Sequence, residues 1–390
     1  MKIRIIGGGP GGLFTSILLK KERPNWDIEV YERNPRGVTW GWGVVFSAET
    51  MGNFLEADAE VYKRITEEFA HWTDIDTFYH DRVIRSTGHT FSGLARVTLL
   101  NILGERAEQL GVPVHYDTHV EDFEQFDDCD LLIGADGLNS RVRNANPEAF
   151  EASVEMGTAR FVWLGSDKSF DAFTFIIREN EHGTFQVHAY QFQEGTSTFI
   201  VECDEQSWQN AGFEEDNEQQ TIDYFEKLFA PELQGAKLLA NHSHWRRFPT
   251  VRCGKWHHGK TVLLGDAAHT AHFSIGSGTK LAMEDAIALA DALLTKDDVQ
   301  SALEHYYEEH WLGVAKIQRA ADVSKRWFEE IARYTKMEPE QFVASLMSRS
   351  KKITHDNLRK RDPRFIAELN AWFAKQAGYE VPAGQVAPPP

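Results

Sequence analysis

Short apolar runs and segments of helical period follow one another over the first 155 residues. Residues 3–6, 28–31 and 130–134 form apolar runs of strand length, which predict buried strands. Residues 13–20 predict a short amphipathic helix, and residues 97–110 predict a longer one. The glycine-containing stretch 41–45 predicts a loop. Because strands and helices alternate, the region predicts a parallel sheet covered by helices.

The period of the apolar positions becomes two between residues 156 and 203. Glycine-containing turns separate these stretches, which predicts a mostly antiparallel sheet. The stretches richest in aromatic and β-branched residues are 173–177, 185–192 and 198–201. Helical spacing returns beyond residue 265, and further helices are predicted at 280–294, 302–329 and 365–376.

Composition and charge narrow the class of protein. The 390 residues include 41 Lys and Arg against 59 Asp and Glu, a net charge of −18. This charge argues against nonspecific nucleic-acid binding and membrane docking, and it suits a cytoplasmic enzyme. Cys129, Cys203 and Cys253 lack metal-ligand spacing, so we expect reduced thiols and no metal site. The N-terminus leads directly into a strand, so we expect neither a signal peptide nor a membrane anchor.

A glycine-rich segment directly follows the first predicted strand. Gly7 permits a tight turn, Gly9 lets the backbone approach a pyrophosphate, and Gly12 allows close packing of helix and strand. The N–H groups of the helix that starts near Pro10 favour a bound phosphate. Glu32 ends the next strand, where an acidic residue can accept hydrogen bonds from a ribose diol. The segment therefore predicts a dinucleotide site.

A second glycine-containing segment follows the apolar run at 131–134. Asp136 lies at this strand end, with Ser140, Arg141 and Arg143 just beyond it. Such a turn can shape the dinucleotide groove while the arginines face phosphate. The alternative is that Asp136 caps the turn that follows it.

A third segment follows the apolar run at 261–264. Asp266 is placed to accept a hydrogen bond from a ribityl hydroxyl, or to cap its own turn. Gly276 and Gly278 precede a helix that starts at Thr279, whose N–H groups can stabilise a negatively charged reduced flavin. A nicotinamide needs no such feature, so the segment favours a flavin. His269, inside this turn, is expected to make a structural hydrogen bond.

The three segments in this order resemble the class A flavoprotein aromatic hydroxylases over roughly residues 1–335. Residues 41–47, 161–165, 187–190 and 272–280 are similar to salicylyl-CoA and 2-aminobenzoyl-CoA hydroxylases, and to the tryptophan-derivative hydroxylase of violacein synthesis. The resemblance implies FAD as cofactor, NADH or NADPH as co-substrate, and O2 as oxidant through a C4a-hydroperoxide. It also implies an aromatic substrate, such as salicylyl-CoA or 2-aminobenzoyl-CoA.

The pattern and the resemblance together predict an α/β fold with a discontinuous, Rossmann-like FAD-binding domain and an inserted, mostly antiparallel substrate domain. The FAD-binding domain is assigned to residues 1–72, 96–155 and 250–335. The substrate domain is assigned to residues 73–95 and 156–249. Residues 336–382 form a C-terminal helical segment, and the proline-rich residues 383–390 are expected to be disordered.

The resemblance extends the list of predicted site residues. It places Arg96 on the flavin pyrophosphate or ribityl chain, and we expect Pro10, Arg33 and Val44 to contact the cofactor as well. His272 stands where the class usually has a proline beside the flavin. Because imidazole titrates near neutrality, His272 is predicted to take or relay a proton of a phenol or aniline. The alternative is that it bonds to the backbone and only shapes its loop.

Side chains of the antiparallel sheet are predicted to form the substrate pocket. Gln186, His188, Tyr190 and Phe192 share one face by alternation. His188 and Tyr190 are candidate catalytic residues, although His188 fits a core or solvent face equally well. The aromatic side chains available to keep the pocket dry are Phe161, Trp163, Phe173, Phe175, Phe185 and Tyr190.

Other assignments stay open. The basic run between Lys351 and Arg364 can bind the phosphates of coenzyme A or form a solvated surface. Arg246 and Arg247 can approach FAD or substrate. The alternative functions are hydroxylation of tryptophan, an indole or another small free aromatic, and non-catalytic redox sensing by a bound flavin. We expect no nucleic-acid or membrane partner, and a homodimer as the assembly.

Overall fold

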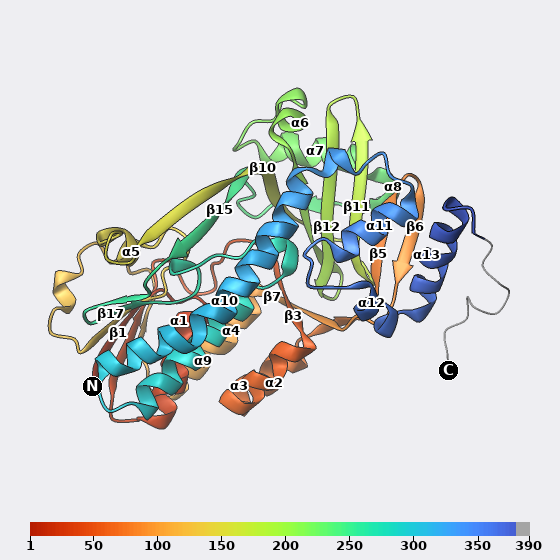
Figure 1. Cartoon of the computed structure of the whole chain (residues 1–390). Coiled ribbons are helices and arrows are strands. Elements are labelled where there is room, and N and C mark those ends of the chain that lie inside the picture. Colours follow the sequence, from red (N-terminus) through yellow and green to blue (C-terminus); the bar gives the residue numbers. More distant parts are fainter. Residues whose placement is uncertain (380–390) are drawn as a thin grey trace.

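Two large sheets organise the computed structural model, which describes residues 1–379 apart from the side chains of residues 47–50 (Figure 1). The first sheet has the strand order β16-β17-β9-β1-β2-β8, and all its pairings are parallel except β16 with β17. Its strands are β1 (Lys2–Ile6), β2 (Asp27–Tyr31), β8 (Val114–His115), β9 (Leu131–Gly134), β16 (His257–His258) and β17 (Thr261–Leu263). The tail expected at residues 383–390 lies outside the described residues.

Helices pack around the first sheet and share its apolar core. They are α1 (Pro10–Glu22), α2 (Ala48–Ala57), α3 (Ala59–Glu67), α4 (Arg96–Gln109), α5 (Arg141–Ala145) and α9 (Gly278–Thr295), with short 3-10 turns η1 (Glu124–Phe126), η2 (Gly265–Ala267) and η3 (Phe273–Ile275). The predicted amphipathic character of α1 is wrong, because every residue from Pro10 to Leu19 is buried. The helix lies between β2, α4 and α9, so nearly its whole surface is covered.

The prediction of a loop at residues 41–45 is also partly wrong. Residues from Gly43 onward form β3 (Gly43–Ser47), which pairs with β7 (Phe91–Ala95), and β4 (Ala70–Trp72) completes a three-stranded sheet. Within residues 41–45, only Gly41 has a left-handed backbone, with φ of 79°. At Gly43 a Cβ would lie 2.5 Å from the Cβ of Phe192, so this glycine is required by close packing of a strand.

The second large sheet is antiparallel except where β11 pairs with β5, as the period of two predicts. Its order is β14-β10-β13-β12-β11-β5-β6, with β15 beside β10. The strands are β5 (Ile75–Tyr79), β6 (Arg82–Ser86), β10 (Ala152–Ser166), β11 (Phe173–Asn180), β12 (Gly183–Gln193), β13 (Thr196–Cys203), β14 (Leu238–Leu239) and β15 (Arg246–Cys253). One face packs against α6 (Glu205–Asn210), α7 (Glu218–Leu228) and α8 (Ala230–Leu233).

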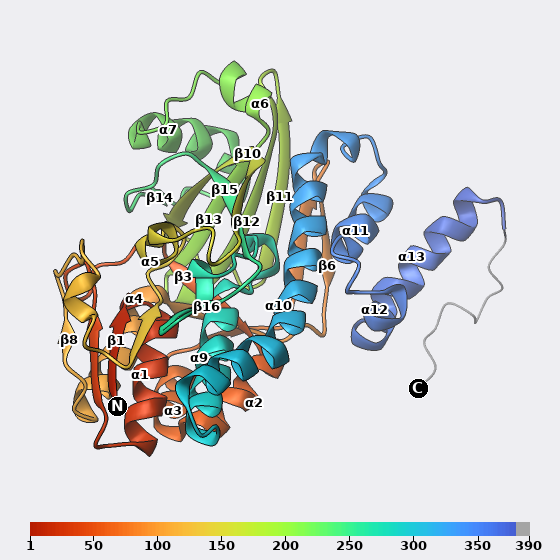
Figure 2. The same ribbon diagram turned by 60° about the vertical axis from the view of Figure 1, so that its left-hand side comes forward.

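A single long helix, α10 (Val299–Glu329), joins the two parts of the molecule. It contacts α9 at one end and β10 and η3 further along, and Figures 1 and 2 show it running diagonally between the two sheets. Beyond it come η4 (Ile331–Arg333), α11 (Pro339–Ser348), α12 (His355–Arg361) and α13 (Pro363–Gln376). Of these, α11 contacts β6, and Figure 2 shows α12 and α13 further from the sheet. No helix within residues 1–379 has the length and apolarity needed to cross a membrane.

Candidate active site

The glycine-rich turn joins β1 to α1 as the sequence predicts. Gly7 has φ of 112°, and a Cβ there would lie 2.2 Å from the carbonyl oxygen of Ala135, so only glycine fits. Gly9 is the N-cap of α1, Pro10 is its first residue, and the position of a Gly9 Cβ has no atom within 4 Å. The start of α1 is therefore open to an anion, as phosphate binding requires.

Glu32 follows β2 and faces the same turn. Its Oε2 accepts a hydrogen bond of 2.7 Å from the backbone N–H of Gly8, and its Oε1 accepts one of 2.8 Å from that of Asn34. The Oε1 also accepts from the side-chain Nδ2 of Asn34 at 2.7 Å, whereas the Oε2 can accept a second bond, so a ribose hydroxyl still has an acceptor here. Arg33, the next residue, is exposed.

Asp136 takes the capping role that the sequence offered, and its role at the cofactor stays a prediction. Its Oδ2 accepts hydrogen bonds from the backbone N–H groups of Arg141 (2.6 Å) and Val142 (3.2 Å), so it caps α5. Its Oδ1 is buried and has no hydrogen-bond partner among the described residues. Burial raises the pKa of this carboxyl. An unpartnered buried acceptor of this kind is available to a ligand.

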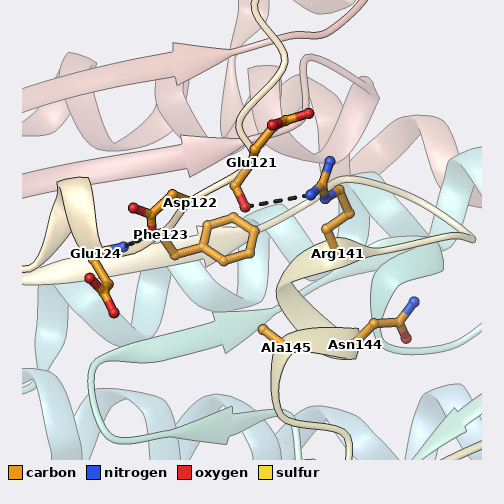
Figure 3. Close-up of a pocket in the computed structure, with 7 residues that line it drawn as sticks. All are labelled: Glu121, Asp122, Phe123, Glu124, Arg141, Asn144 and Ala145. Atoms are coloured by element: carbon orange, nitrogen blue, oxygen red, sulfur yellow. Dashed lines mark hydrogen bonds between the residues drawn. The ribbon is translucent and has the colours of Figure 1, made fainter.

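The arginines beyond Asp136 do not face phosphate as predicted. Arg143 is buried and donates to the carbonyl oxygens of Ala267 (2.9 Å) and Leu138 (2.8 Å), so it braces two turns internally. Arg141 is exposed and lies against His119. It lines an open depression of about 480 Å³, and Figure 3 shows its guanidinium pointing toward the backbone of Glu121. The orientations of the Arg141 and Arg143 side chains therefore depend on contacts with residues that are remote in the sequence.

Asp266 and Arg96 bring the separated segments together. Arg96 is the first residue of α4. Burial lowers its pKa, and the opposing effects of Asp266, Tyr190 and Glu32 are too small to reverse this shift. Asp266 is exposed, but the surrounding protein desolvates it enough to raise its pKa. A Cβ on Gly11 of α1 would lie 2.5 Å from the Cδ1 of Leu264, directly before η2, and 3.0 Å from the carbonyl oxygen of Ala282 on α9, so these separated segments converge beside the glycine-rich turn.

The N-terminus of α9 adjoins this site. Gly276 is exposed with φ of 62°, and a Cβ there would lie 3.8 Å from the Cβ of Val45 on β3. Val44 is buried in the same strand. The helix starts at Gly278 and Thr279 with no side-chain cap and no acidic residue in its first turn. Its first N–H groups are therefore free to stabilise an anionic ring.

His269 makes a buried ion-pair contact, but its ring nitrogens do not make the expected hydrogen bond among the described residues. Its Nε2 lies 2.9 Å from the Oδ2 of Asp285 on α9, which also accepts the backbone N–H of Gly265 at 2.6 Å. His310 of α10 reaches the other oxygen at 2.8 Å. Burial acts against the charge of Asp285, but His269 and His310 outweigh it and lower the pKa of this carboxyl. The cluster fixes the turn that carries Asp266.

His272 is buried and does not titrate near neutrality, contrary to the premise of its predicted proton relay. Burial, with the charges of His188, Lys325 and Arg349, holds its pKa well below the usual value. Its Nδ1 lies 3.3 Å from the backbone N of Ser274, which donates to it. This bond matches the alternative in which His272 shapes its loop.

Two further buried groups meet His272. The Oε1 of Glu202 on β13 lies 3.8 Å from its Nε2, and the Oε2 lies 3.4 Å from the Nε2 of His188. Burial and the charge of Arg349 lower the pKa of His188 to about 3, while burial raises that of Glu202 well above its usual value. The sequence reasoning missed Glu202, although a lone carboxylate in the apolar run 198–203 was a usable signal.

Tyr190 lies on the same face of the sheet. Its hydroxyl donates to the carbonyl oxygen of Gly43 at 2.9 Å and so ties β12 to β3. Its ring stacks near Trp72 and Phe173, with centroids 6.0 and 5.6 Å away. Burial raises the pKa of Tyr190 to about 12, so the hydroxyl stays protonated. The catalytic role of Tyr190 stays a prediction.

The aromatic side chains predicted to line the pocket share one face of the sheet, with the exception of Phe185. The side chains of Phe161, Trp163 and His188 all contact Phe273 of η3, with ring centroids 5.0, 5.8 and 5.5 Å from it. Phe185 instead belongs to the core on the opposite face, against Phe225 of α7. Alternation explains this, because odd and even positions of β12 point to opposite faces.

The remaining basic candidates lie outside this site. Arg247 pairs with Glu205 of α6 at 2.6 Å, and Arg246 is exposed. The basic side chains of the run between Lys351 and Arg364 are all exposed. Among the described residues, no group of three or more His, Cys, Asp or Glu could hold a metal ion.

The groups of the site fit FAD. The open N-terminus of α1 suits a pyrophosphate, the acceptors of Glu32 and Asp136 suit sugar hydroxyls, and the free N-terminus of α9 suits a flavin ring. Residues 1–321 match the sequence profile described as FAD binding domain. The chain belongs to this FAD binding domain family. The chain is an FAD-dependent monooxygenase with NAD(P)H as co-substrate.

Two relatives from this family are similar over most of the chain. A salicyloyl-CoA 5-hydroxylase of a Streptomyces species is 39% identical over 386 residues, covering 96% of this chain and 74% of the relative. The 3-hydroxy-4-methyl-anthranilyl-(aryl-carrier protein) 5-monooxygenase of Streptosporangium sibiricum is 32% identical over 332 residues, covering 85% and 90%. The first similarity extends past residue 335, where the sequence motifs end.

The fold is also that of a solved oxygenase. A 2-methyl-3-hydroxypyridine-5-carboxylic acid oxygenase mutant superposes with a TM-score of 0.66 at 17% identity, covering 92% of this chain and 98% of that structure. This confirms the predicted α/β fold class with its inserted sheet and C-terminal helices.

Proposed function

We propose that this monooxygenase hydroxylates the ring of an aromatic acyl thioester with an ortho hydroxyl or amino group, such as salicylyl-CoA or 2-aminobenzoyl-CoA. The observation that carries the proposal is the 39% identity over 386 residues to a salicyloyl-CoA 5-hydroxylase. The name of the second relative also describes an aromatic acyl group on a carrier. The aromatic face of the second sheet supports the proposal, because it offers an apolar surface to a ring.

Different residues of the chain would bind the cofactor and the substrate. Bound FAD would accept a hydride from NAD(P)H and activate O2 for transfer to the ring. Gly9 and the start of α1 would hold its pyrophosphate, Arg96 and Asp266 its ribityl side, and the N-terminus of α9 its ring. The aromatic side chains against Phe273 would keep water from the reacting oxygen. In this proposal, Tyr190 and His188 line the substrate side.

The same proposal assigns the two parts of the chain. Residues 1–72, 96–155 and 250–335 would bind FAD, and residues 73–95 and 156–249 would bind substrate. The position of β5 and β6 in the second sheet supports the assignment of residues 75–86. In contrast, β7 pairs with β3, which belongs to the assigned FAD-binding segments.

Substrate-dependent turnover tests the proposal. Purified protein should be yellow, and salicylyl-CoA or 2-aminobenzoyl-CoA should accelerate NAD(P)H consumption and yield a product heavier by one oxygen. The measurement is absorbance at the NAD(P)H band with mass spectrometry of the product. The free acids and tryptophan form the comparison panel. Hydroxylation of tryptophan or a free acid, with no thioester product, would establish the alternative.

A matched pair of variants separates the two faces of the sheet. Phe161→Leu changes the face that meets Phe273, and Phe185→Leu makes the same change in the opposite core. We expect the first to alter the KM for the thioester and the product yield per NAD(P)H. The second should lower thermal stability and leave that yield unchanged.

We also propose that the enzyme is a cytoplasmic homodimer. The net charge of −18 supports a location away from anionic membranes. Exposed large apolar side chains support a protein contact, among them Val154, Met156, Trp311 and Leu312. Light scattering of the purified protein should give twice 44.4 kDa, and the mass of one chain would contradict the dimer.

A further inference from the structure

Arg349, just after α11, reaches the loop beside the proposed flavin ring. Its Nη2 donates to the carbonyl oxygen of Ser274 at 2.7 Å, and its Nε donates to the Oγ of Ser324 on α10 at 3.0 Å. Its guanidinium also lies over the rings of Phe175 and Phe328, with centroids 5.2 and 5.0 Å away. One side chain therefore connects the C-terminal segment, α10, the second sheet and η3.

The hydrogen bonds from Arg349 have a fixed direction. A guanidinium and a backbone N–H can only donate, so the Oγ of Ser324 accepts from Arg349, and the Nδ1 of His272 accepts from the backbone N–H of Ser274. An accepting Nδ1 carries no hydrogen, so the Ser274 hydroxyl must use its own hydrogen there and must accept from the hydroxyl of Ser324, 2.8 Å away. The hydroxyl of Ser274 then donates to the Nδ1 of His272 at 2.9 Å. Because Nδ1 accepts, a neutral His272 carries its proton on Nε2.

The groups on the far side of His272 suit this tautomer. Its Nε2–H faces the Oε1 of Glu202, while the Oε2 of Glu202 and the Nε2 of His188 have no hydrogen-bond partner among the described residues. The charges that act on this cluster from α10 and α11 are Lys325, Glu329 and Arg349. Two of them are cations, which disfavour a second proton on His272.

We propose that Arg349 is a positioning residue for ring hydroxylation: through Ser324 and Ser274 it fixes the Nε2–H tautomer of His272 and holds residues 272–278 in one conformation. Ser324 and Arg349 both lie beyond residue 321, where the match to the family profile ends. The hydrogen bonds from Arg349 through Ser324 therefore start in the C-terminal part of the chain. The proposal depends on the proposed function only because it names ring hydroxylation as the reaction that Arg349 supports. A fixed loop keeps water from the reacting oxygen and so keeps NAD(P)H oxidation coupled to product.

Histidine nitrogen NMR of the FAD-loaded protein tests the tautomer directly. Long-range 15N–1H spectra distinguish a neutral ring protonated on Nε2 from one protonated on Nδ1, and His272→Gln assigns the signals. We expect the wild type to show only the Nε2–H form at neutral pH. Ser324→Ala, which removes one hydroxyl of the chain, should introduce the Nδ1–H form, and Arg349→Lys should do the same.

The matched control is Ser345→Ala. The Oγ of Ser345 accepts from Trp327 at 2.9 Å on the neighbouring helix and lies outside the chain of bonds to His272. It should leave the His272 signals unchanged. A proton on Nδ1 of His272 in the wild type would overturn the proposal, as would wild-type signals in both Ser324→Ala and Arg349→Lys. Ser324→Ala removes only one hydroxyl, so this variant still tests the proposal if the Arg349→Lys protein does not fold.

Coupling measures the consequence for catalysis. Losing one hydrogen bond of this chain should lower product per NAD(P)H about three- to tenfold in Ser324→Ala, while flavin reduction by NAD(P)H stays within about twofold. Unchanged coupling together with an altered tautomer would reject the positioning role. If the wild type hydroxylates no thioester, the proposed function fails, whereas the NMR result still decides the tautomer.

Discussion

Gly9 and Gly12 lie three residues apart and meet opposite surroundings. A Cβ on Gly9 would have no neighbour within 4 Å, whereas a Cβ on Gly12 would lie 2.1 Å from the carbonyl oxygen of Gly7. One glycine therefore leaves space for a ligand, and the other lets α1 pack against the turn. The sequence motif contains both without distinguishing their roles.

This difference predicts separate effects of two alanine substitutions. Gly12→Ala should lower the free energy of unfolding of the FAD-free protein by roughly 1–3 kcal/mol, because overpacking forces a backbone shift. Gly9→Ala should change it by less than about 1 kcal/mol and weaken FAD binding instead. Chemical denaturation and flavin fluorescence titration measure the two quantities. Equal loss of stability in both variants would contradict the assignment.

At the scale of elements, a buried carboxylate joins α9, α10 and the turn at Gly265. Asp285 accepts the N–H of Gly265, and His310 reaches it from α10. Burial lowers the pKa of His310, but the hydrogen bond and charge of Asp285 outweigh it and raise that pKa. A raised folded-state pKa means that protonated His310 stabilises the fold below its unfolded pKa.

This linkage predicts how the stability of the α9–α10 contact depends on pH. His310→Gln should cost about 1.5–3 kcal/mol of unfolding free energy near pH 6, as expected for a charge-assisted hydrogen bond. The cost should decrease as the pH rises through the folded pKa of His310. Denaturation at a series of pH values measures it, with His305→Gln on the same helix as control. A cost that increases with pH would contradict this account.

At the scale of the molecule, the chain passes repeatedly between its two large sheets. The strands β5 and β6 join the second sheet before β8 and β9 join the first, and β16 and β17 complete the first sheet only after β10–β15. The helix α10 then packs on α9 and β10. A third apolar cluster joins β5, β11 and α10 to the C-terminal helices. No single cut of the chain would separate the two sheets into continuous halves.

This connectivity predicts one cooperative unfolding transition for the FAD-free protein. Far-ultraviolet circular dichroism and tryptophan fluorescence should give the same midpoint in guanidinium chloride. Trp163 of the second sheet and Trp256 of the first core both contribute to the fluorescence. Two transitions with different midpoints would show that the sheets unfold independently.

The sequence alone determined the local features of this protein. The turn at Gly7 and Gly9, the end of β2 at Glu32, and the glycines before α9 could be located because strands, turns and helix starts depend on neighbouring residues. Their order along the chain was enough to indicate a flavin. Alternation on β12 also placed His188 and Tyr190 on one face.

Only the tertiary structure decided what depends on remote partners. Arg143 faces carbonyl oxygens because Ala267 lies beside it, more than a hundred residues away. The neutral state of His272 depends on burial under Lys325 and Arg349, and Glu202 joins it from another strand. Desolvation and the direction of a hydrogen-bond chain arise only when distant segments pack together, so no local pattern of residues could predict them.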